Sequence, residues 1–146
     1  MKRILKVLLS LFIIFNIVGC SSTSPKTIKE DGYYYSKEDV CTYLQTYGEL
    51  PDNFITKNEA ERLGWDNRKG NLWEVADGMC IGGDKFGNRE GLLPKEKGRQ
   101  YYECDIDYNG KYRNEKRIVY SNDGLIYYTD DHYESFEDIT YEDYYN

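Results

Sequence analysis

The feature that most constrains the fold of this chain is the spacing of its apolar residues. In the first half they recur at helical spacing, and in the second half they alternate as in a β-strand. Val40, Cys41, Leu44 and Tyr47 recur on one face of a predicted helix. Residues 36–39, Ser-Lys-Glu-Asp, open that helix with a pattern that resembles a capping box. The first element of the folded part is therefore predicted to be a helix.

Two further short helical segments are predicted before the spacing changes. Residues 56–59, Thr-Lys-Asn-Glu, repeat the capping pattern ahead of Ala60 and Leu63, and Gly64 supplies the expected terminator. A third helical turn is expected at residues 72–75. All the predicted helices thus lie in the first half of the chain.

From about residue 76 the sequence favours strands. The runs 118–120 and 125–128 flank Asn122-Asp123-Gly124, which is a strong hairpin signal. Residues 101–106 alternate between two faces of a strand, with Tyr102, Cys104 and Ile106 on one and Tyr101, Glu103 and Asp105 on the other. We therefore predict an α+β domain in which N-terminal helices pack on one face of an antiparallel β-sheet.

The first nineteen residues have the features of an export signal. Lys2, Arg3 and Lys6 precede or interrupt the start of an apolar run, residues 4–18, that is short for a membrane span. The run ends in Ile-Val-Gly-Cys, which resembles the lipobox of bacterial lipoproteins, so Cys20 is predicted to be acylated. This predicts a signal peptide at 1–19, a flexible tether at 20–31 and an extracellular, membrane-anchored protein. A signal anchor or a freely secreted product is the alternative.

The charge of the chain limits the kinds of nucleic-acid site that it can carry. The signal contains three of the 19 basic residues and none of the 26 acidic ones, so the mature part has a net charge of −10. An acidic surface disfavours broad, nonspecific phosphate binding. Any nucleic-acid site must then be a local basic patch. The acidic, tyrosine-rich end, residues 141–146, is predicted to be a solvated tail.

Three cysteines remain once Cys20 is assigned to lipid. Cys41 lies on the apolar stripe of the first helix and Cys104 on the core face of its strand, so these two are slightly favoured as a disulfide. Two buried free thiols are about equally compatible with the pattern. Together with Cys80 and one histidine, they make a poor zinc set, so no metal is expected.

A series of specific strings spans the chain from about residue 40 to residue 140 without an evident gap. They lie at residues 44–47, 50–57, 63–65, 69–72, 81–84, 88–91, 112–114, 117–118 and 131–133. Together they closely resemble the barnase family of bacterial guanyl-preferring ribonucleases. The resemblance implies that residues 32–140 form a ribonuclease domain with the α+β fold of that family, and that the chain is a monomer.

The resemblance also implies a reaction and its catalytic residues. In this family the 2′-OH of RNA attacks its own phosphodiester, which gives a 2′,3′-cyclic phosphate that water can open, without a cofactor or metal. Glu103 matches the general base and His132 matches the general acid. Lys57, Arg113 and Arg117 match the cations that hold the phosphate. By residue pattern alone a single histidine is more often structural than catalytic.

The same resemblance implies a substrate and an inhibitor. A carboxylate at Glu90 would accept hydrogen bonds from N1 and N2 of guanine, which predicts cleavage of single-stranded RNA after guanosine. DNA lacks the 2′-OH and should be inert. A cytoplasmic barstar-type inhibitor would bind the cationic site. The residues that match the substrate-binding set are Asp84, Phe86, Gly87, Asn88, Arg89, Glu90 and Tyr133.

The chain departs from the family in its acidity, its cysteines, its C-terminal extension and Gly124, which replaces a tryptophan. These departures leave open a second class of function, a surface-binding lipoprotein that keeps the fold but has lost turnover. Intact Glu103, His132, Arg113 and Arg117 argue against that loss.

Overall fold

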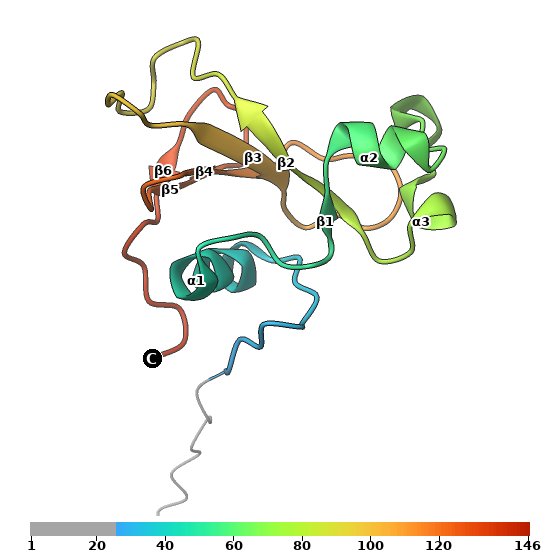
Figure 1. Ribbon diagram of the computed structural model, residues 1–146, viewed down its shortest axis with the longest axis horizontal. Helices are drawn as coiled ribbons and strands as arrows, with labels where there is room; N and C mark the ends of the chain where they lie inside the picture. Colours follow the sequence, from blue (N-terminus) through green and yellow to red (C-terminus); the bar gives the residue numbers. More distant parts are fainter. Residues whose placement is uncertain (1–25) are drawn as a thin grey trace, which may run out of the picture.

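A computed structural model describes residues 26–146, so the predicted signal peptide, Cys20 and the first part of the tether lie outside the described residues. None of the helices within residues 26–146 has the length and apolar character needed to cross a membrane. Figure 1 shows one sheet with α1 beneath it and two smaller helices at one end. In chain order the elements are α1 (Lys37–Tyr47), β1 (Phe54–Ile55), α2 (Lys57–Arg62), a 3-10 turn (Asn67–Lys69), α3 (Leu72–Val75), β2 (Cys80–Phe86), β3 (Tyr101–Asp105), β4 (Arg117–Ser121), β5 (Ile126–Thr129) and β6 (Glu137–Asp138).

The predicted helix starts are confirmed, and side-chain caps explain them. The Ser36 hydroxyl accepts a hydrogen bond from the Asp39 amide at the start of α1, and Gly48, with φ 74°, ends that helix. At the start of α2, Thr56 and Glu59 form a complete capping box. Local polar chemistry therefore fixes both boundaries.

The strands lie in the sheet in the order in which they occur in the chain, β1 to β6. Neighbours from β2 to β6 are antiparallel, and the predicted hairpin joins β4 to β5. The α+β prediction is confirmed, although β1 pairs with β2 in parallel. The two-residue strands β1 and β6 were not predicted, because their sequences carry too few residues to show alternation.

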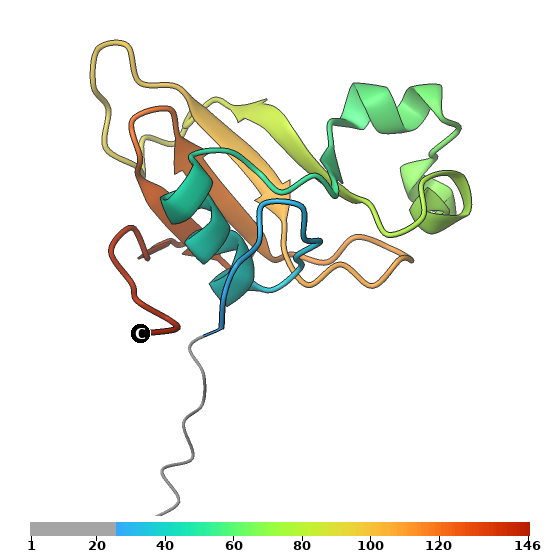
Figure 2. The same cartoon turned by 60° about the horizontal axis from the view of Figure 1, so that its bottom comes forward.

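The main core lies between α1 and one face of the sheet, and Figure 2 shows α1 crossing that face. Its buried residues are apolar, and the partly buried rings of Tyr120 and Tyr128 extend it. A second cluster packs α2 and α3 against the β1–β2 end. The buried residues of the main core are Val40, Cys41, Leu44, Cys104, Ile106, Ile118, Ile126 and Ile139.

The opposite face of the sheet carries a smaller apolar cluster beside charged residues. Tyr101, Val119 and Tyr127 pack there with Leu93. Because Glu103 pairs with Val119 across β3 and β4, its side chain emerges on this same face. The sheet therefore separates the main core from the face that presents Glu103.

Residues 26–31 and 141–146 both contact α1, although most residues of the two segments are exposed, as the prediction of a tether and a solvated tail requires. Ile28 is buried, and Lys26 Nζ lies 2.7 Å from Asp39 Oδ1. The Tyr145 hydroxyl donates to the same Asp39 oxygen at 2.6 Å, and Gln45 donates to the Glu142 carbonyl. A tyrosine can bury its ring while its hydroxyl forms a hydrogen bond with a polar group. The acidic charge pattern of the tail gave no sign of such contacts.

The predicted Cys41–Cys104 disulfide is also wrong, since Cys41, Cys80 and Cys104 are all free and buried. Cys41 and Cys104 belong to the main core, as expected, but as small apolar side chains. Burial raises the pKa of Cys41 and of Cys80 to about 12. These thiols therefore stay protonated at neutral pH.

Candidate active site

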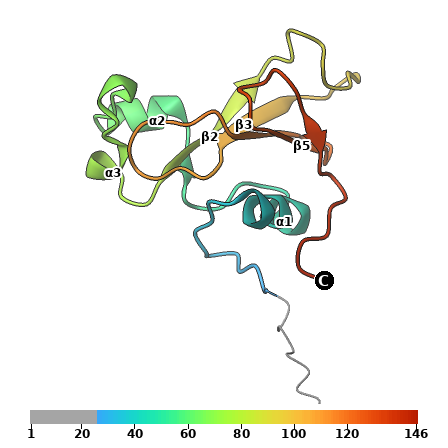
Figure 3. The ribbon, with the colours of Figure 1, turned by 180° about the vertical axis from the view of Figure 1, so that it is seen from behind.

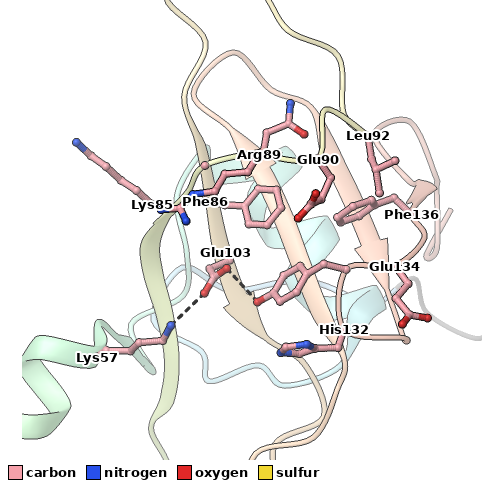
Figure 4. A pocket seen from close by; sticks show the side chains of 13 residues that line it. Lys57, Lys85, Phe86, Arg89, Glu90, Leu92, Glu103, His132, Glu134 and Phe136 are labelled. Carbon is pink, nitrogen blue, oxygen red and sulfur yellow. Dashed lines mark hydrogen bonds and ion pairs between the residues drawn. The ribbon is translucent and has the colours of Figure 1, made fainter.

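A cavity of about 690 Å³ opens on the face of the sheet opposite α1. Strand β3 supplies its floor, the start of α2 one side, and the loops after β2 and β5 the remainder. Figure 4 shows Glu103 at the centre, Lys57 on one side and His132 below. The residues that line the cavity are Lys57, Lys85, Phe86, Gly87, Asn88, Arg89, Glu90, Leu92, Glu103, His132, Tyr133, Glu134 and Phe136.

The Glu103 carboxylate is held through both of its oxygens. Lys57 Nζ lies 3.3 Å from Oε1, and the Tyr133 hydroxyl donates to Oε2 at 2.9 Å. Burial of Tyr133, with the nearby Glu103 charge, raises the pKa of that hydroxyl well above its ordinary value, so it remains a donor at neutral pH. A fixed carboxylate of this kind is suited to accept a proton from a bound substrate.

Lys57 is placed by the junction between α2 and β2. It is the first residue of α2, and its backbone amide donates to Asp84 Oδ2 at 3.1 Å. The pairing of β2 with β3 shifts register between Gly82 and Asp84, where Gly83 has φ 98°. Asp84 thus ties the start of α2 to the sheet and sets the position of Lys57.

His132 lies in a loop with unusual backbone geometry. His132 and Tyr133 have φ values of 55° and 72°, in the left-handed region that costs non-glycine residues about 1 to 3 kcal/mol each. The loop is held by Asp131, which accepts hydrogen bonds from Thr129 Oγ1 and from the Ser135 amide. The Ser135 hydroxyl also donates to Asp131. This bond, followed by those from the Ser135 amide and Thr129, lowers the pKa of Asp131 to about 2.

The loop after β2 forms the upper part of the cavity in Figure 4, where the Glu90 carboxylate points inward. Phe86 stacks on Tyr133, with ring centroids 5.2 Å apart. The buried Asn88 closes the loop, because its side chain both donates to the Leu93 carbonyl and accepts from the Leu93 amide. Phe86, Tyr133 and the loop therefore present an aromatic wall and a carboxylate to one space.

A second cavity, of about 710 Å³, adjoins the first and shares His132 and Glu134 with it. Arg113 and Arg117 line this second cavity. Both guanidinium groups pair with Asp105, Arg113 at 2.7 Å and Arg117 at 3.1 Å. His132 therefore lies between the cavity that contains Glu103 and the cavity that contains Arg113 and Arg117.

Comparison with known proteins assigns a family to this arrangement. A family described as ribonuclease matches residues 37–140. The chain belongs to this ribonuclease family. The ribonuclease of Heyndrickxia coagulans is 55% identical over 102 residues, which are 70% of this chain and 94% of that protein. The ribonuclease of Bacillus intermedius is equally similar, but the match covers only 63% of its length.

A more distant relative is the guanyl-specific ribonuclease St of Saccharopolyspora erythraea. It is 42% identical over 55 residues, which are 37% of this chain and 54% of that protein. Family membership, together with the cavity around Glu103, makes this ribonuclease an RNA-cleaving enzyme.

The structure of the ribonuclease brings most of the predicted site residues together. Lys57, Glu103 and His132 line one cavity with the loop residues 86–90 and Tyr133. Arg113 and Arg117 line the adjoining cavity. Asp84 lines neither cavity, but its carboxylate accepts a hydrogen bond from the Lys57 backbone amide. Within residues 26–146 no cluster of three or more potential metal ligands occurs.

Sequence reasoning missed one residue of the ribonuclease site, Asp105. Its side chain is only 2% exposed, yet it holds both arginines of the second cavity. A signal was present, because alternation placed Asp105 on the same face as Glu103, and it pairs directly with Arg117 in the sheet. An acidic residue on a sheet face with two nearby arginines is best explained as their common partner.

Proposed function

We propose that this ribonuclease cleaves single-stranded RNA after guanosine and forms a 2′,3′-cyclic phosphate. The observation that supports the proposal most strongly is the position of Glu103 and His132 in one cavity, with cations on both sides. A carboxylate base and an imidazole acid are the two groups that such a transfer requires.

In the proposed step, Glu103 takes the proton of the 2′-OH, and the 2′ oxygen attacks phosphorus. The bond from phosphorus to the 5′ oxygen of the next nucleoside breaks, and His132 gives that oxygen a proton. Lys57, Arg113 and Arg117 stabilise the charge that develops on the phosphorane. In a second step water opens the cyclic phosphate, with the two groups acting in reverse.

The loop after β2 supports a preference for guanine. Glu90 points into the cavity, where it can accept from N1 and N2, and the backbone amides of the loop can donate to O6. The stacked rings of Phe86 and Tyr133 lie beside that position. Adenine offers no matching pair of donors. The guanyl-specific relative is in accord with this proposal.

We place the enzyme outside the cytoplasm, anchored through an acylated Cys20, on the basis of its N-terminal sequence. A barstar-type inhibitor that protects the producing cell is part of the same proposal. The anchor and the inhibitor are both proposed from sequence resemblance.

The test uses the folded part, residues 26–146, on the dinucleotides GpC, ApC, UpC and CpC. We expect 2′,3′-cyclic guanosine phosphate from GpC, much slower cleavage of the others, and none of deoxy-GpC. Glu103→Gln and His132→Asn should each lower kcat by about 10²-fold to 10⁴-fold. Asparagine is the better replacement for His132, since it tolerates a φ of 55°.

Thermal unfolding of each variant serves as the control for folding. Wild-type protein that yields no cyclic guanosine product would disprove the proposed reaction. Equal cleavage of GpC and ApC would disprove the base preference alone.

A further inference from the structure

The cations around the cavity differ in whether a carboxylate of the chain already neutralises them. Lys57 pairs with Glu103, and the two arginines of the second cavity pair with Asp105. Lys85 and Arg89, by contrast, form no ion pair within residues 26–146 and are both exposed. In a chain with a net charge of −7, unpaired cations beside a ligand cavity are available to a ligand's phosphates.

Lys85 lies at an edge of the sheet that is open. β1 pairs with β2 only at Cys80 and Ile81, so no strand among the described residues covers the outer edge of β2 beyond them. Lys85 is paired with Tyr102, so its side chain leaves β2 on the face opposite Glu103, and in Figure 4 it extends outward past the open edge. In the same view Lys57 and the Arg89 guanidinium lie on that side of Glu103. The other side of the cavity carries Leu92, Phe136 and the Glu134 carboxylate.

The direction of the RNA follows from His132, and this step rests on the proposed function. His132 protonates the departing 5′ oxygen, so the nucleoside 3′ to the cleaved bond lies on its side, toward the second cavity. Guanosine occupies the loop after β2. The RNA that precedes guanosine must then leave the first cavity elsewhere, and the β2 edge is the cationic exit.

We propose that Lys85, with Arg89 beside it, binds the backbone phosphate on the 5′ side of the recognised guanosine. Lys85 takes no part in bond breaking. It makes guanosines inside an RNA chain better substrates than a guanosine at the 5′ end. The site recognises a phosphodiester of single-stranded RNA through charge, without reading a base.

Three substrates test the proposal: GpC, the 5′-extended UpUpGpC and the 3′-extended GpCpUpU. Lys85→Ala should lower kcat/KM on UpUpGpC about fivefold and leave GpC and GpCpUpU within about twofold of wild type, an order of magnitude typical of one exposed phosphate contact. Lys85→Glu should lower kcat/KM on UpUpGpC further. The slope of log kcat/KM against log salt on UpUpGpC should become shallower by about 0.7, the value for one phosphate of a single strand.

Lys29→Ala is the matched control, because Lys29 is exposed, has the same charge and lies in the segment that packs against α1 on the opposite face. This variant should have the wild-type kcat/KM on all three substrates. An equal loss on GpC, or a loss on GpCpUpU as large as that on UpUpGpC, would overturn the proposal, as would no loss on UpUpGpC. Wild-type protein that fails on GpC would instead overturn the proposed function, and this inference with it.

Discussion

The two faces of the sheet use buried residues in opposite ways. Against α1 every buried residue of the main core is apolar. On the cavity face Asp105 and Arg117 are nearly as buried, but they are charged and pair with each other. Strand β3 contributes to both faces by alternation, since Cys104 points to the core and Glu103 to the cavity. Stability therefore comes mainly from one face, and chemistry from the other.

The largest effect should come from Asp105→Asn, which removes the negative charge that pairs with Arg113 and Arg117 and leaves the main core unchanged. The change leaves Arg117 buried without a full partner, so we expect the free energy of unfolding to fall by about 3 to 5 kcal/mol. Arg113 could keep at most one of its two hydrogen bonds to residue 105 and would lose the ion pair, so kcat/KM on GpC should fall as well. Urea denaturation and cleavage well below the melting temperature measure the two effects.

Leu44→Ala, in the main core, is the matched control for that comparison. It should cost about 2 to 5 kcal/mol through lost burial and a cavity, yet the folded fraction should cleave GpC at the wild-type rate. If both variants lost stability and kept full activity, the conclusion that catalysis depends on the charged residues of the cavity face would be wrong.

A smaller effect is expected from Tyr145→Phe, which tests how firmly the C-terminal segment belongs to the α1 side. The variant loses the hydrogen bond to Asp39 and keeps the ring, so the free energy of unfolding should fall by about 1 kcal/mol, with no change in cleavage. Tyr141→Phe, whose side chain is 90% exposed, is the control and should change neither. Identical urea midpoints for the two variants would show that the hydrogen bond between Tyr145 and Asp39 adds no stability.

The smallest effect concerns the pH dependence of the loop that carries His132. The pKa of Asp131 is about 2 in the fold and 3.8 in a free side chain, so its stabilising contribution is complete above about pH 5 and is lost as the pH falls toward 2. Asp131→Asn should therefore show a smaller loss of stability between pH 5 and pH 2 than the wild type.

Urea denaturation at pH 5, 3 and 2 measures this difference. Asp130→Asn is the control, because Asp130 has no hydrogen-bonding side-chain partner within residues 26–146. Parallel pH curves for wild type and Asp131→Asn would contradict the role given to Asp131.

The elements that could be predicted from the sequence are those fixed by local chemistry. The hydroxyls of Ser36 and Thr56 set two helix starts, and Asn122-Asp123-Gly124 sets a hairpin. β1 and β6 exist only through pairing with distant strands, so no local pattern marks them. The docking of Tyr145 on Asp39 likewise joins residues 106 positions apart.

The candidate site followed from family resemblance, and residue patterns alone would not have selected it. Glu103 is one of 26 acidic residues, and His132 is a single histidine. What distinguishes Glu103 is its contacts with Lys57 and Tyr133, which come from α2 and from the loop after β5. Only the tertiary fold brings these three segments together.

The packing of both chain ends on α1 has a practical consequence. Residue 26 and Tyr145 meet at Asp39, on the side of the sheet away from the cavity, and the C-terminus lies beside α1 when the molecule is seen from behind (Figure 3). A bead, a fluorophore or a fusion partner joined to either end would leave the cavity facing open solution. The enzyme can thus be immobilised by its ends on a solid support while its catalytic face stays accessible to long RNA.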